Sequence, residues 1–178
     1  AFKTKGKHSK RLAIDKIMLD GFKSLENRDF KIENGEKIME HARSIKSAEE
    51  IKAMRCSISA CETSMHLMEN KTEPGMSEND IWSILHSENI KRGGEWIETR
   101  LLSSGNKTNP WFQECGSRVL QNNEIVAFDT DLVGCYSICT DISRTWWIGD
   151  QEPTNEMKQD YRIALDHIQQ NAELVAPG

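Results

Sequence analysis

Three aspartates lie in the part of the sequence with the clearest β-strand character. Residues 124–133 and 136–148 are rich in β-branched and aromatic residues; the first run contains Asp129 and Asp131, and the second contains Asp141. Because side chains alternate faces along a strand, Asp129 and Asp131 are expected on the same face. A tight turn between the two strands places Asp141 roughly opposite Asp131, so the three carboxylates converge on one patch of sheet.

Such a patch favours a divalent cation. Like charges opposite each other in a sheet are destabilising unless a positive charge compensates them, and carboxylate oxygens are ligands of hard divalent metals. Asp129, Asp131 and Asp141 are therefore candidate metal ligands. The alternative is that one or two of them flank the turn or face solvent. Arg144 is interpreted either as an ion-pair partner that orients a carboxylate or as an exposed strand arginine.

The elements around the two strands predict an α+β fold. Ser47 and Glu50 form a capping box before a helix whose apolar stripe runs to about residue 70, and Ser77 opens a second helix that stops at Gly93-Gly94. Residues 95–104 are predicted as a strand, followed by a loop rich in Gly, Asn and Pro, and a final helix begins near Pro153. This order predicts helices packed on one face of an antiparallel sheet.

The first 40 residues have weaker patterns. Residues 11–25 are compatible with a helix, and residues 31–33 and 36–38 with short extended pieces. The chain starts at Ala1 and stops at Ala176-Pro177-Gly178, where Pro-Gly is typical of the end of a helix followed by more chain. We therefore expect an internal fragment of a longer protein.

Composition narrows the function classes. The chain has 178 residues with 23 Lys plus Arg against 28 Asp plus Glu, and this net charge of −5 gives no reason to expect nucleic acid as a partner. No apolar run approaches the roughly 20 residues that span a bilayer, so no membrane association is expected. The five cysteines are odd in number and have no CxxC spacing, which indicates inert thiols in a reducing compartment and hence a cytoplasmic protein.

The segment Asp141-Ile142-Ser143-Arg144-Thr145 and the hairpin that it closes resemble the first metal hairpin of the pita-bread metallopeptidase superfamily, which includes creatinase, prolidase and methionine aminopeptidase. Residues 43–51 resemble the linker and first helix of its catalytic domain, and residues 104–106 its active-site loop. The resemblance implies that residues 41–178 are the N-terminal half of that domain, which is incomplete here, and that residues 1–40 are the end of an N-terminal domain with its linker. It also implies that a His and two Glu ligands lie outside this chain.

Two positions depart from the peptidase pattern. Peptidases of this superfamily place the first aspartate eleven residues before the second, but the residue eleven before Asp141 is Thr130, flanked by Asp129 and Asp131. Trp111 stands about where these peptidases carry a histidine after the active-site loop. Both changes argue against ordinary peptide hydrolysis.

The Asp-x-Asp variant, together with residues 94–102 and 109–114, is similar to the DddP-type dimethylsulfoniopropionate lyases. This resemblance implies an iron-containing homodimer that splits dimethylsulfoniopropionate into dimethyl sulfide and acrylate; manganese, zinc or cobalt are alternatives to iron. Trp111 is then a candidate to face the sulfonium cation, because an indole face attracts cations, or else it packs beneath the loop. The catalytic base is not identified. The alternatives are an Xaa-Pro aminopeptidase or dipeptidase, and a non-catalytic binding module of the same fold.

Overall fold

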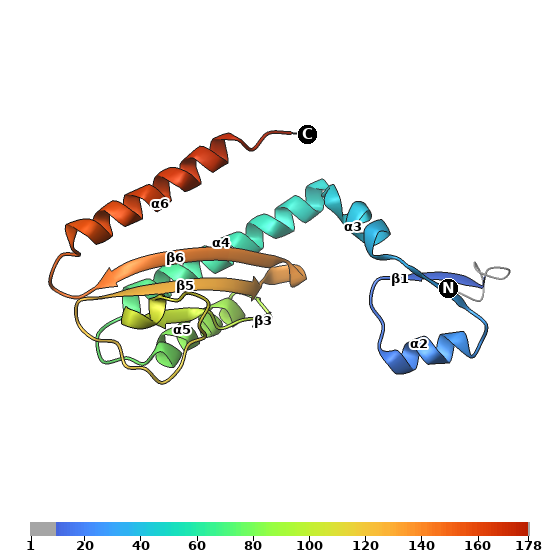
Figure 1. Cartoon of the computed structure of the whole chain (residues 1–178), viewed down its shortest axis with the longest axis horizontal. Coiled ribbons are helices and arrows are strands. Elements are labelled where there is room, and N and C mark those ends of the chain that lie inside the picture. Colours follow the sequence, from blue (N-terminus) through green and yellow to red (C-terminus); the bar gives the residue numbers. More distant parts are fainter. Residues whose placement is uncertain (1–9, 178) are drawn as a thin grey trace. The chain divides into compact units, whose positions relative to one another are not determined.

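The computed structural model describes residues 10–177, so the first nine residues of the predicted N-terminal segment lie outside it. The chain divides into two compact units, the first ending at Ile51 and the second beginning at Lys52 (Figure 1). The predicted division at residue 40 concerns domains of the whole protein and stays a prediction.

The first unit contains a small βαβ motif. Strands β1 (Arg11–Ile14) and β2 (Lys31–Asn34) pair in parallel, and α2 (Leu19–Glu26) connects them. The helix predicted over residues 11–25 is wrong for its first half, because residues 11–14 pair with a strand that follows far along the chain. The strand predicted at 31–33 is confirmed. The extended piece predicted at 36–38 is wrong, since α3 (Glu36–Ser44) starts there, next to Asn34, whose side chain accepts a hydrogen bond from the Glu36 amide.

Helices α4 and α5 each begin at a side-chain cap. The capping box before α4 (Ala48–Lys71) is confirmed: Glu50 accepts from the Ser47 amide at 2.7 Å, and the Ser47 hydroxyl accepts from the Glu50 amide. Helix α5 (Glu78–Lys91) has the same arrangement between Ser77 and Asp80. These side chains satisfy the free amides of each first turn, which is why both helices begin where the sequence predicts.

The sheet of the second unit is antiparallel throughout, as predicted. Strand β5 (Glu124–Val133) pairs along its full length with β6 (Cys139–Ile148), and its other edge pairs with β3 (Trp96–Ile97) and β4 (Leu102–Ser104). The strand expected over residues 95–104 is thus two short strands with an irregular stretch between them.

The two faces of β5 have different neighbours. Val126, Phe128, Thr130 and Leu132 are buried, and the apolar ones join the core formed with α4 and α5. The Phe128 ring makes edge contacts with two tryptophans, at centroid distances of 6.3 and 6.0 Å; these are Trp82 and Trp146. The intervening residues of β5 therefore lie on the opposite face, and they include both aspartates.

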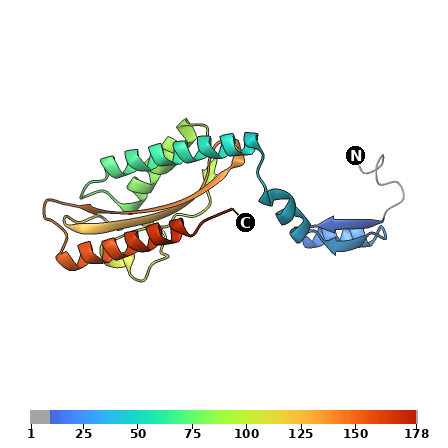
Figure 2. The same ribbon diagram turned by 90° about the horizontal axis from the view of Figure 1, so that it is seen from above.

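Helix α6 (Asn155–Glu173) lies on the side of the sheet away from α4 (Figure 2), so the prediction that the helices all lie on one face of the sheet is wrong. Its N-cap is Thr154, whose hydroxyl accepts a hydrogen bond from the Met157 amide. All residues of α6 are exposed, so its apolar stripe contributes nothing to the core. Within residues 10–177, no helix is long and apolar enough to cross a bilayer.

Candidate metal centre

The β5–β6 pairing places the three predicted metal ligands on one face of the sheet. Asp131 is the register partner of Asp141, and Asp129 is the partner of Ser143. The chain reverses between the strands through a short 3₁₀ turn, η2 (Cys135–Ser137). The predicted opposition of Asp131 and Asp141 is confirmed, although the metal-binding role of the three aspartates stays a prediction.

The three carboxylates repel one another. Asp129 and Asp131 are half-buried and Asp141 is exposed. The nearby Asp129 carboxylate, followed by burial and the charge of Asp131, raises the pKa of Asp141 above its ordinary value. A divalent cation with oxygen ligands would relieve this repulsion, so the donor set fits a metal of that class by charge and by chemistry.

Two hydroxyl groups orient these carboxylates. Ser143 Oγ donates to Asp129 Oδ1 at 2.8 Å, and Thr99 Oγ1 donates to Asp131 Oδ2 at 2.9 Å. Neither residue was predicted as part of the site. Ser143 shares the face of Asp141 two residues along the same strand, so alternation along β6 could have identified it. Thr99 comes from the irregular stretch between β3 and β4, and only the tertiary pairing of that stretch with β5 brings it there.

The carboxylates do not form a closed cluster on their own. Among the residues that the structure describes, no three His, Cys, Asp or Glu side chains are grouped so that they could hold a metal ion. The hairpin therefore supplies donors of the right type on one face, and a cation would have to draw them together.

The end of the loop that carries Trp111 lies near Asp129. The Asp129 amide donates to the Leu101 carbonyl, and Leu101 forms a β-bridge with Glu114, just beyond the loop. Because neighbouring strands lie about 4.8 Å apart, Glu114 is about two strand spacings from Asp129. Trp111 is 36% exposed and its ring meets the ring of Phe112 edge-on at 6.5 Å. The position of Trp111 at the surface leaves its predicted substrate contact untested.

Arg144 is not an ion-pair partner of the aspartates. It is the register partner of Phe128, which places it on the opposite face of the sheet from Asp129 and Asp141. There it is exposed and lines a small hollow with Glu62, His66 and other residues of α4. Of the two interpretations of Arg144, the exposed strand arginine is correct.

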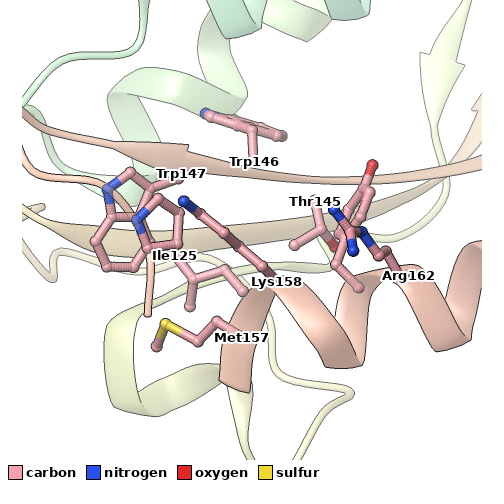
Figure 3. Close-up of a pocket in the computed structure, with 9 residues that line it drawn as sticks. Ile125, Thr145, Trp146, Trp147, Met157, Lys158 and Arg162 are labelled. Carbon is pink, nitrogen blue, oxygen red and sulfur yellow. The ribbon is translucent and has the colours of Figure 1, made fainter. Parts of the chain in front are cut away.

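The face that bears the aspartates has an apolar hollow at its other end. Ile125, Thr145 and Trp147 of the sheet line it from one side and Met157 of α6 from the other (Figure 3). Tyr161 of α6 also lines it. Its volume is about 380 Å³. Ile125 lies four residues, or about 13 Å along the strand, from Asp129, whereas Thr145 is the register partner of Ala127 and so lies only about one strand repeat from Asp129. The hollow and the carboxylate patch are therefore neighbours on the same face of the sheet.

Comparison with known proteins gives one family match and two curated relatives. The family model described as metallopeptidase family M24 matches residues 52–178. The chain is 56% identical over 174 residues to the dimethylsulfoniopropionate lyase DddP of Roseobacter denitrificans, covering 95% of this chain and 39% of that protein. It is also 56% identical, over 173 residues, to the DddP lyase of Roseovarius nubinhibens. The chain thus spans 39% of the length of each curated relative.

Solved structures of peptidases share the fold at low sequence identity. The prolidase of Pyrococcus horikoshii superposes with a TM-score of 0.85 at 18% identity, covering 94% of this chain and 49% of that one. The X-Pro aminopeptidase of Thermotoga maritima gives a TM-score of 0.79 at 21% identity, covering 92% and 46%. At such identities the likeness shows the fold alone, and it confirms the predicted α+β pita-bread architecture.

Proposed function

Because the chain belongs to metallopeptidase family M24, we propose that the whole protein containing it is a metal-dependent lyase that cleaves dimethylsulfoniopropionate to dimethyl sulfide and acrylate. The observation that carries this proposal is the 56% identity to two curated lyases over at least 94% of the chain. The two peptidase structures described above share the fold at only 18% and 21% identity.

The position of Thr130 supports a site that differs from a peptidase site. It is the residue eleven before Asp141, where the superfamily pattern expects an aspartate, and its side chain is 0% exposed in the core. A ligand at that position would point away from Asp141. Asp129 and Asp131, on either side of Thr130, lie on the same face of the sheet as Asp141. Strand alternation thus lets the Asp-x-Asp pair take the place of the single aspartate.

Asp129, Asp131 and Asp141 would hold the metal, which we propose is iron, with manganese, zinc or cobalt as alternatives. When bound, such a cation supplies positive charge that holds the substrate carboxylate and stabilises the negative charge that develops beside it. Thr99 and Ser143 fix the orientation of two of the carboxylates. We propose that the remaining ligands lie outside this chain.

The elimination removes a proton from the carbon beside the substrate carboxylate and breaks the carbon–sulfur bond, which releases dimethyl sulfide and leaves acrylate. The cationic sulfonium end needs an electron-rich partner, and we assign Trp111 to it because an indole face attracts a desolvated cation. The base that takes the proton must lie within about 3 Å of it, and we place this base outside the present chain. We further propose that the whole protein is a cytoplasmic homodimer.

The decisive experiment uses the full-length protein supplied with iron. Dimethylsulfoniopropionate is added and dimethyl sulfide is measured by gas chromatography for the wild type, for Asp131→Ala and for the matched control Asp160→Ala on the exposed α6. Dimethyl sulfide from the wild type and the control, with none from Asp131→Ala, supports both the lyase and the hairpin's role. Cleavage of an Xaa-Pro dipeptide without dimethyl sulfide would mean a peptidase. Neither product from the wild type, with no metal affinity that is lost in Asp131→Ala, would leave the metal-free, non-catalytic module.

A further inference from the structure

Glu78, the first residue of α5, is a buried carboxylate surrounded by donors. Its exposed fraction is 0%, and it accepts hydrogen bonds from the Ser104 amide at 3.0 Å and the Ser104 hydroxyl at 2.8 Å. It also accepts from the Lys107 ammonium at 2.6 Å and the Gly116 amide at 3.0 Å. An ionised carboxylate is an acceptor only, so this set matches it. Since Ser77 and Asp80 cap the helix, Glu78 is not needed for that task.

The donors to the Glu78 carboxylate lie within one loop, residues 105–113, or just outside its two ends. Ser104 ends β4 and Lys107 lies in the short 3₁₀ helix η1 (Gly105–Thr108), whereas Gly116 lies beyond the other end of the loop. Trp111 lies between them. Lys107 donates a further hydrogen bond to the Glu114 carbonyl. A single buried side chain on α5 therefore fixes both ends of the loop that presents Trp111.

A second ion pair supports the start of the same loop. Arg118 pairs with Glu124, with an N–O distance of 2.6 Å, and also donates to the Ser104 hydroxyl. Gly105 packs against this pair so closely that a Cβ atom there would lie 2.3 Å from a carboxylate oxygen of Glu124, and its φ of +54° favours glycine. Ser104 thus links the two ion pairs into one network beneath the loop.

We propose that Glu78, through its ion pair with Lys107, is a positioning residue that holds the Trp111 loop in the orientation that binds the cationic end of the substrate. This inference rests on the proposed lyase function, because the substrate contact of Trp111 belongs to that function. The Glu78 side chain accepts hydrogen bonds only from Ser104, Lys107 and Gly116 among the described residues, and these lie within the loop or at its two ends.

The test compares Glu78→Gln, Trp111→Ala and the double variant in the full-length iron-loaded protein. Trp111→Ala is expected to raise KM for dimethylsulfoniopropionate roughly two- to thirtyfold and to change kcat far less. If Glu78 acts through Trp111, the rise in KM for Glu78→Gln is no larger than that for Trp111→Ala. The double variant then has the KM of Trp111→Ala alone, because the two substitutions remove the same contact. Additive effects of the two substitutions would overturn the proposal.

Amide hydrogen exchange gives a readout that does not depend on the substrate. Glu78→Gln is expected to speed exchange in residues 105–113 while exchange in β5 and β6 stays as in the wild type. If Glu78→Gln leaves the exchange of residues 105–113 unchanged, Glu78 does not position the loop, even if the protein is a lyase. If exchange is faster in Glu78→Gln but the wild type releases no dimethyl sulfide, the proposed lyase function is wrong, whereas the contact between Glu78 and the loop is supported. Should Glu78→Gln fail to fold, Lys107→Met makes the same comparison, with Lys107→Arg as the conservative variant expected to restore both KM and exchange.

Discussion

Asp131 and Asp141 lie directly opposite each other in the antiparallel pair β5–β6, and Asp129 lies one strand repeat away on the same face. The proximity of Asp129 contributes most to the raised pKa of Asp141, ahead of burial and of Asp131. The hairpin therefore holds like charges together at a cost in stability that a bound cation would offset.

Asp141→Asn is expected to stabilise the metal-free protein and to remove its response to metal. One charge fewer relieves repulsion by up to about 1 kcal/mol, while an amide is a poorer ligand than a carboxylate. Urea unfolding of the full-length protein, with a chelator and then with added iron or manganese, measures both effects. Asp160→Asn on α6 is the control and should match the wild type in both conditions. A metal-free Asp141→Asn protein less stable than the wild type would contradict the repulsion argument.

Thr99→Val is expected to weaken metal affinity about 10- to 100-fold, because the Asp131 carboxylate loses the hydroxyl donor that orients it. Ser143→Ala should act similarly through Asp129. Competition with a chromophoric chelator measures the affinity directly. Thr63→Val is the matched control, since Thr63 lies at an exposed position of α4 and its hydroxyl donates to the Ser59 carbonyl of the same helix. Equal affinities for Thr99→Val and Thr63→Val would remove Thr99 from the site.

The register of the β5–β6 hairpin could be predicted because it depends on local rules. Alternation along β5 and a short turn are enough to place Asp131 opposite Asp141. The contact from Thr99 could not be predicted in this way, because it depends on which edge of β5 the preceding segment joins. Glu78 is a similar case: in the sequence it is one more acidic residue in the first turn of a helix, and only tertiary packing makes it the anchor of a loop.

In the first unit, a local pattern predicted the wrong element. Ile14, Met18 and Phe22 recur at the four-residue spacing of a helix, yet Ile14 lies in β1 because residues 31–34 supply a parallel partner strand. Arg11 strengthens this pairing through a two-pronged hydrogen bond to Glu33, with distances of 3.1 and 2.9 Å. Local periodicity carries no information about a partner twenty residues away, so a short strand of this kind is easily taken for the start of a helix.

Trp111→Ala is expected to abolish inhibition by a small quaternary ammonium ion. If Trp111 faces the sulfonium, tetramethylammonium should compete with the substrate for the same indole face, because both cations lack hydrogen-bond donors and bind aromatic rings by charge. Inhibition constants for tetramethylammonium are measured for the wild type, Trp111→Ala and Trp111→Phe. Tyr161→Ala, at an exposed position of α6, is the control. The inhibition constant of Trp111→Phe is expected to lie between those of the wild type and Trp111→Ala. Undiminished inhibition of Trp111→Ala would place the cation elsewhere.

Glu88 is expected to make stability depend on acid pH. Glu88 is 7% exposed, and its carboxylate accepts hydrogen bonds from Arg92 at 2.6 Å and from Lys91 at 2.9 Å. These bonds lower the pKa of Glu88 from 4.5 to about 2, and the bond from Arg92 has the larger effect. Because the folded pKa lies below the unfolded one, the ionised Glu88 stabilises the fold fully above pH 4.5, and this contribution is lost as the pH falls towards 2.

Glu88→Gln removes this titration while it keeps the size and an acceptor oxygen. The difference in unfolding free energy between wild type and Glu88→Gln should therefore be constant from about pH 7 to 5 and shrink steadily below pH 4.5. Urea unfolding of the chelator-treated protein at a series of pH values measures it, and taking the difference cancels the other carboxylates. Glu69→Gln, at an exposed position of α4, is the control and should give a much flatter difference. A wild-type advantage over Glu88→Gln that persists unchanged at pH 3 would show that the pairing with Arg92 does not hold this carboxylate ionised.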